Sequence, residues 1–193
     1  MDSKVSPGLK LMVVFVVLSE QTVLFILPTI IVYMVEFLLT DSKGNKPDPS
    51  TIAYTIALIE GLNRTGIIIG AFFWGYISDI IGRKNSLTCT IIGFSLTSIG
   101  FGLSTNIYTA TFWRICSGLF SGSINILKAT ISDLSTDQNI SVLYSFFSTG
   151  FGISSILGPV LAGFFSRPYE AFPSVFDNEF FHRYPYFLPF AIK

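Results

Sequence analysis

Long apolar segments are the feature that most restricts what this chain can fold into. Five of them approach or exceed the roughly 20 residues of α-helix that cross the hydrocarbon core of a bilayer. They lie at about residues 9–37, 52–77, 87–103, 108–131 and 142–165. Charged residues make up only 12% of the chain, against roughly 25% in a soluble domain. Because backbone groups inside a bilayer must be hydrogen-bonded internally, these segments predict an all-α, polytopic transmembrane bundle forming one domain over residues 1–193.

A sixth apolar segment begins at Tyr184 and ends with the sequence at Lys193. A segment this short cannot span a bilayer. We interpret it as the start of a sixth transmembrane helix, so the sequence predicts a six-helix unit with the last helix truncated. The first connection, residues 40–51, is short and carries turn-forming residues such as Gly44 and Pro47.

The composition argues against several classes of function. The formal net charge is zero, which offers no basic patch for nucleic acid. The single histidine, His182, lies in a polar loop, whereas Cys89 and Cys116 fall inside apolar segments. No metal-ligand cluster follows from these residues. A membrane enzyme is an alternative, but it would need a catalytic cluster that the chain does not offer. We therefore expect no cofactor, no bound metal and no enzymatic activity.

A short charged turn separates the second and third apolar segments. It reads Gly75-Tyr-Ile-Ser-Asp79-Ile-Ile-Gly82-Arg83-Lys84. A tight charged turn between two membrane-length segments has to lie at a water interface. One carboxylate and two cations fixed there can hold helix ends in one of two arrangements. The turn therefore predicts a gating element made of Gly75, Asp79, Gly82, Arg83 and Lys84.

Several charged residues lie inside the predicted spans, where a charge near the bilayer centre costs at least about 2.5–3.5 kcal/mol and usually marks a function. Glu20 lies about ten residues into the first span, near mid-depth, and Arg114 about six residues into the fourth. Glu60 and Arg64 are four residues apart on one face of the second span. That spacing suits an internal ion pair with no further role as well as a functional pair. Glu20 has no partner at such spacing, so we predict that it couples transport to protons.

Small residues recur every four positions on two of the predicted helices. In the fourth span, Arg114 is followed by Gly118 and Gly122. In the fifth span, the ridge consists of Gly150, Ser154, Gly158 and Ala162, with Pro159 next to Gly158. Such ridges let helices approach closely, either as static packing or as a sliding contact. Pro159 removes a backbone donor and permits a bend.

Taken together, these patterns resemble the motifs of the major facilitator superfamily of transporters. Three stretches carry the resemblance: Gly75-x-x-x-Asp79-x-x-Gly82-Arg83-Lys84 is similar to motif A, Arg114-x-x-x-Gly118-x-x-x-Gly122 to motif B, and Ser154-x-x-x-Gly158-Pro159-x-x-Ala162-Gly163 to motif C of drug:proton antiporters. The three motifs occur in family order on the expected helices. The resemblance covers nearly the whole chain, as the N-terminal half of a twelve-helix transporter.

Finer details resemble the zinc-induced-facilitator-like branch, near the tetracycline exporters. The residues concerned are Ser19-Glu20-Gln21, Trp74-Gly75 and Tyr184-Pro-Tyr-Phe-Leu-Pro189. The chain also departs from the family pattern at four positions. Ile80 and Asn85 stand where basic residues are usual, and Ser154 and Ala162 replace glycines.

The resemblance implies a cytoplasmic N-terminus and alternating access by rocking of two halves. It implies that Glu20, Arg114 and Gly118 lie on helices that face the central cavity, where they serve proton coupling or substrate contact. The antiporter-motif residues Ser154, Gly158, Pro159 and Gly163 would lie on a helix of the moving seam. Asp79 would stabilise one state by pairing with Arg83 and with helix ends of the other half.

The sequence thus predicts part of a proton-coupled secondary transporter that exports a small organic solute. Its expected partners are the lipid bilayer, the solute, protons, and a C-terminal half or a second subunit. The expected location is a vacuolar or plasma membrane. The alternative is a truncated or half-size membrane protein without transport activity of its own. The residues do not identify the substrate.

Overall fold

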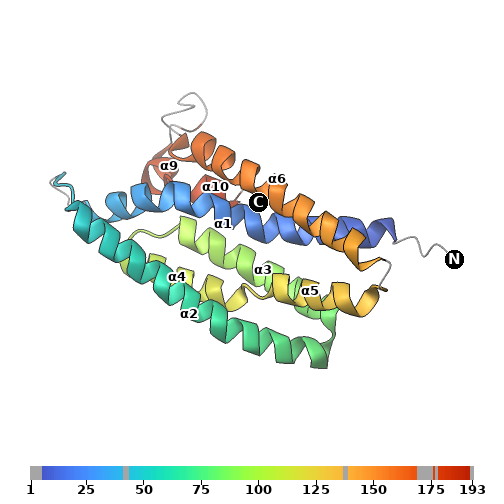
Figure 1. Ribbon diagram of the computed structural model, residues 1–193. Coiled ribbons are helices and arrows are strands. Elements are labelled where there is room, and N and C mark those ends of the chain that lie inside the picture. Colours follow the sequence, from blue (N-terminus) through green and yellow to red (C-terminus); the bar gives the residue numbers. More distant parts are fainter. Residues whose placement is uncertain (1–5, 41–43, 137–138, 169–175, 177, 192–193) are drawn as a thin grey trace.

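The structure, a computed structural model, describes residues 6–40, 44–136, 139–168, 176 and 178–191. The helices, labelled as in Figure 1, are α1 (Pro7–Leu39), α2 (Pro49–Ile81), α3 (Arg83–Gly102), α4 (Ile107–Phe120), α5 (Ser123–Leu134), α6 (Ile140–Phe165), α9 (Glu179–Arg183) and α10 (Phe187–Ala191). Strands are absent from these described ranges. The predicted all-α bundle is confirmed.

Among the described residues, three helices are long and apolar enough to cross a membrane: α1, α2 and α6. Helix α3 has 20 residues. The fourth predicted span is interrupted, because α4 ends at Phe120 and α5 begins at Ser123. The start of the sixth predicted span contains α10, while its last residues, Ile192 and Lys193, lie outside the described residues.

The helices run up and down along one common direction and pack mainly in pairs (Figure 1). Helix α1 packs along α6, α2 packs along α4, and α3 contacts α4, α5 and α10. The turn between α2 and α3 lies at the same end of the bundle as the end of α5, because Arg83 pairs with Asp133 there. We call this end the Arg83 end and the other the Asn106 end.

Local sequence explains two of the helix boundaries. Gly82 has φ 89° and ψ 149°, a conformation that favours glycine, and it separates α2 from α3 without a longer loop. Asn106 caps α4: its side-chain oxygen accepts a hydrogen bond of 2.8 Å from the backbone N–H of Thr109. These two positions reverse the chain at opposite ends of α3.

Apolar packing forms two clusters, one toward each end of the bundle. The cluster at the Arg83 end includes Val17, Trp74 and Leu127, and the other includes Val23 and Phe94. Between Val17 and Val23, helix α1 buries the polar run Glu20, Gln21 and Thr22. A layer of buried polar side chains therefore lies between the two apolar clusters.

Candidate functional site

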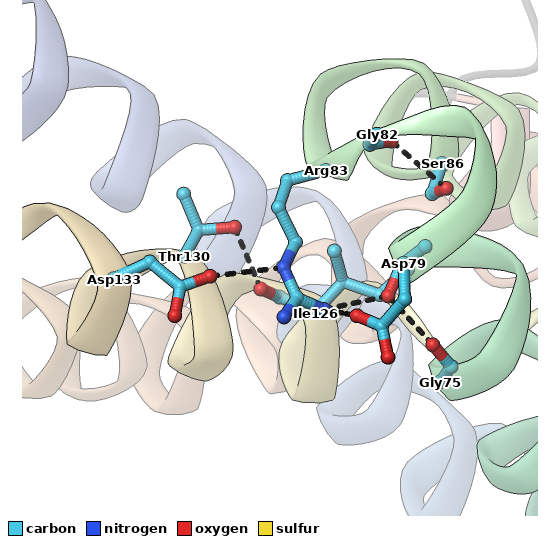
Figure 2. A network of polar contacts seen from close by, with 9 residues as sticks. Gly75, Asp79, Gly82, Arg83, Ser86, Ile126, Thr130 and Asp133 are labelled. Atoms are coloured by element: carbon cyan, nitrogen blue, oxygen red, sulfur yellow. Dashed lines mark hydrogen bonds and ion pairs between the residues drawn. The ribbon is translucent and has the colours of Figure 1, made fainter.

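The charged turn at the Arg83 end forms a network around one guanidinium (Figure 2). Arg83 Nη1 lies 3.0 Å from Asp79 Oδ1 and donates a hydrogen bond of 2.7 Å to Ser78 Oγ. Its Nε lies 3.1 Å from Asp133 Oδ2. The hydroxyl of Ser78 in turn donates to the carbonyl oxygen of Gly75. Arg83 therefore links the end of α2 to the end of α5.

Asp133 is a member of this network that the sequence reasoning missed. In the sequence it follows the fourth predicted span, which ends at about residue 131. The available signal was its position at the same end of the bundle as Arg83. Lys84, by contrast, is exposed, and its side chain forms neither a hydrogen bond nor an ion pair within the described residues.

We expect Asp133→Asn to change the free energy of unfolding by less than about 1 kcal/mol. The side chains of Arg83, Asp79 and Asp133 are 32%, 67% and 55% exposed, so water screens their pairing. Denaturant titration of the purified protein in detergent, with Arg83→Gln completing a double-mutant cycle, measures the coupling. A coupling energy above about 2 kcal/mol would show that the network is a structural anchor rather than a weak, reversible contact.

Glu20 lies in the polar layer, with a relative exposure of only 3%. Its Oε1 accepts a hydrogen bond of 2.6 Å from Ser121 Oγ, and its Oε2 accepts one from Ser123 Oγ. The two serines flank the break between α4 and α5. The sequence offers Glu20 no partner on its own helix. In the structure, two hydroxyl groups at an interrupted helix donate hydrogen bonds to its carboxylate.

The break itself is held by α2. Trp74 Nε1 donates a hydrogen bond of 2.9 Å to the carbonyl oxygen of Leu119, on the last turn of α4. Gly122 fits against the same indole: a Cβ there would lie 3.0 Å from Trp74 Cβ. Carbonyl groups at a helix end need such outside donors. Glu20 on α1 and Trp74 on α2 thus contact the break from two helices.

Arg114 is the centre of a second buried network. Its Nε and Nη2 lie 3.1 and 2.9 Å from Glu60 Oε1. The amide nitrogen of Asn63 donates to the backbone carbonyl oxygen of Arg114 at 2.8 Å and to Ser117 Oγ at 3.3 Å. The internal Glu60–Arg64 pair that the spacing suggested does not form. Arg114 is only 4% exposed, and a buried guanidinium is the costlier of the two to leave unpaired, so it takes the carboxylate.

Gly118 serves the contact between α4 and α2. A Cβ on Gly118 would lie 2.5 Å from the carbonyl oxygen of Asn63, and one on Gly66 would lie 2.8 Å from that of Ile115. Gly70 is equally close to the carbonyl group of Leu119. The structure therefore places Gly118 against a neighbouring backbone, while its predicted part in a cavity remains a prediction.

The ridge on α6 faces α1. Gly150 contacts Val17, Gly158 lies against Phe25, and Thr22 Oγ1 donates a hydrogen bond of 3.4 Å to Ser154 Oγ. Pro159 and Gly163 lie on the other, exposed side of α6. The antiporter-motif residues are thus divided between an internal contact and an exposed face.

The charged residues among the predicted site residues form three separate groups rather than one. The turn residues lie around Arg83, Glu20 contacts the serines at the helix break, and Arg114 contacts Glu60 and Asn63. Within the described residues, no group of three or more His, Cys, Asp or Glu side chains could hold a metal ion. The arrangement places buried charge at a helix break and between two packed helices.

This order of motifs agrees with a comparison with protein families. The model of the Major Facilitator Superfamily matches residues 10–176. The chain belongs to the major facilitator superfamily. The resemblance seen in motifs A, B and C is therefore confirmed at the level of the family. The sequence and the fold together support an integral membrane protein of a transporter superfamily.

Curated relatives within this superfamily carry transporter names. The chain is 28% identical over 184 residues to "Protein ZINC INDUCED FACILITATOR 1" of Arabidopsis thaliana, which covers 95% of this chain and 37% of the relative. It is 30% identical to "Major facilitator-type transporter psiT2" of Psilocybe cubensis over 77% of this chain and 28% of the relative. It is 32% identical to "Major facilitator superfamily multidrug transporter mfsB" of Aspergillus fumigatus over 70% of this chain and 24% of the relative. The expected resemblance to zinc-induced-facilitator proteins is confirmed, and the chain spans about a quarter to a third of these relatives' length.

Proposed function

We propose that this chain is the N-terminal half-bundle of a proton-coupled secondary transporter that exports a small organic solute. The single observation that carries the proposal is the position of Glu20, a buried carboxylate whose two oxygens accept hydrogen bonds from serines on either side of an interrupted helix. A buried ionisable group in a membrane span is a strong candidate for a proton-coupling site.

The proposed coupling step is a change in hydrogen bonding at the break. An ionised Glu20 accepts from both Ser121 and Ser123. A protonated carboxyl group carries one O–H donor, so one of the two contacts must reorient or open. Because Ser121 lies in the break directly after α4 and Ser123 is the first residue of α5, protonation changes which arrangement of these helices is favoured. This is how loading a proton would bias alternating access.

The remaining elements have roles consistent with this proposal. With a cytoplasmic N-terminus, the Arg83 end faces the cytoplasm, where the weak pairs of Arg83 would open and close with the transport cycle. The exposed face of α6, including Pro159 and Gly163, would meet the C-terminal half or a second subunit. The membrane, vacuolar or plasma, and the solute are not specified by these contacts.

The start of the sixth span supports the half-bundle architecture. Helix α10 contacts α1, α3 and α6. The same three helices line a hollow of about 290 Å³ that includes Leu18, Ser95 and Leu161. A second hollow of about 410 Å³ shares Phe15 and Ile91 with it and extends toward the Arg83 end. We propose that a sixth span continuing from α10 packs along this groove.

Glu20→Gln tests the proposal, and Trp74 provides the readout. Trp74 contacts the break, and Trp113 is the only other tryptophan in the sequence. In a Trp113→Phe background in detergent, we expect the emission of Trp74 to change with pH, and we expect Glu20→Gln to abolish that change. Glu36→Gln is the matched control, because Glu36 lies near the end of the same helix and pairs with the exposed Lys46. A pH response that survives in Glu20→Gln refutes the coupling role.

Transport itself is measured in vesicles that carry a pH gradient, with the cation ethidium and the anion 1-naphthoate as probes. Uptake of either probe that depends on the gradient and on Glu20 supports the full proposal. The second candidate function is a membrane protein without transport activity of its own. A pH response of Trp74 without uptake of either probe supports that candidate.

A further inference from the structure

Arg64 carries a charge that no function described above uses. It lies fifteen residues after the first residue of α2 and seventeen before the last. At about 1.5 Å per residue, both helix ends are more than roughly 20 Å away. An arginine side chain cannot reach a membrane surface over that distance by extending along the helix. Arg64 is nevertheless exposed on the bundle surface.

The carboxylate nearest in sequence does not neutralise this charge. Glu60 is one turn away, but its Oε1 accepts from both Nε and Nη2 of Arg114. Within the described residues, the side chain of Arg64 forms no hydrogen bond and no ion pair. Arg114 and Arg64 thus have one nearby carboxylate between them. Arg114 pairs with it, so the uncompensated positive charge lies on Arg64.

The surface beside Arg64 leaves room for a ligand. Gly61 is on the preceding turn, and a Cβ there would meet no atom within 4 Å. Ile68, on the following turn, is 60% exposed. The guanidinium is therefore bordered by an empty position on one side and an apolar side chain on the other. A guanidinium binds a carboxylate through two parallel hydrogen bonds, which makes this group the best-matched ligand.

We propose that Arg64 binds the carboxylate of a small apolar organic acid. This inference rests on the proposed transport function, because it assigns the solute a chemical class. An anion at this position compensates a charge that is otherwise costly near the bilayer centre. Glu60 stays with Arg114, so binding does not require the buried network to open. The apolar part of the acid lies over Gly61 and Ile68.

The test uses the purified 193-residue chain in detergent and three probes of the same shape. These are 1-naphthoate, the neutral 1-naphthamide and the cationic 1-naphthylmethylamine. A ligand that binds only the folded state raises the thermal midpoint with concentration. We expect a saturable rise with naphthoate alone. We expect Arg64→Gln to weaken naphthoate binding about tenfold or more, and Arg64→Lys to retain part of it.

Lys46→Gln is the matched control, because it removes an exposed cation outside this region. It should leave naphthoate binding unchanged. Equal shifts with all three probes, an unchanged shift in Arg64→Gln, or no shift in the unsubstituted protein would each overturn the proposal. The midpoint needs neither a proton gradient nor transport. A failure of proton coupling therefore leaves this result intact, and the two proposals fail separately.

Discussion

Glu60→Gln is expected to lower the free energy of unfolding by about 3–5 kcal/mol, the largest effect of any single substitution proposed for this protein. The reason is that Arg114 keeps its charge while losing its counter-ion. Its guanidinium is 4% exposed and receives both of its carboxylate contacts from Glu60. Denaturant titration of the purified protein in detergent, followed by circular dichroism, measures the loss.

Two comparison variants separate charge from packing. Glu36→Gln removes a pair whose partner, Lys46, is 77% exposed, so it should cost less than about 1 kcal/mol. Replacing both partners, Glu60→Met with Arg114→Met, should cost less than Glu60→Gln alone, because no unpaired charge remains buried. If Glu60→Gln and Glu36→Gln lower the free energy of unfolding equally, the unpaired guanidinium of Arg114 must be hydrated despite its low exposure.

Gly70→Ala is expected to lower the free energy of unfolding by about 1–3 kcal/mol. A Cβ on Gly70 would lie 2.9 Å from the carbonyl carbon of Leu119. That atom belongs to the backbone of α4, so it cannot rotate away as a side chain would. The helices α2 and α4 must therefore separate, and the hydrogen bond from Trp74 to Leu119 must lengthen with them.

Gly61→Ala is the matched control on the same helix. A Cβ on Gly61 meets nothing within 4 Å. Alanine favours a helix over glycine by about 0.5–1 kcal/mol, so this variant should be as stable as the unsubstituted protein or slightly more stable. Thermal midpoints and tryptophan emission of both variants provide the comparison. Equal destabilisation at Gly61 and Gly70 would mean that helix contact does not set the cost.

The sequence predicted most of the fold because its signals are local. The length of each apolar segment decides which segments enter the bilayer. Gly82 decides where the chain turns from α2 into α3. The interruption of the fourth span was not predicted. Its sequence, Phe120-Ser-Gly-Ser123, continues a pattern of small residues that also suits an unbroken helix. At the break, Trp74 on α2 donates a hydrogen bond to Leu119, and Glu20 on α1 accepts one from Ser121.

The candidate site was predicted only in part, since the residues were found but not their partners. Arg83 was expected to pair with Asp79, and it does, yet Asp133 joins it from a helix 50 residues later. Glu60 was considered with Arg64 because four residues separate them, but it pairs with Arg114 instead. Spacing along one helix identifies neighbours within that helix. It carries no information about which residue a packed neighbour presents.

By itself, then, the sequence determined the membrane-length apolar helices, the charged turn, and the motifs that identify the superfamily. Only the tertiary structure decided which charges are compensated, and therefore which one is left over. The physical reason is that burial cost depends on what lies across a helix contact. Glu20 is satisfied by serines 101 and 103 residues away, Arg114 by Glu60, and Arg64 by no described residue.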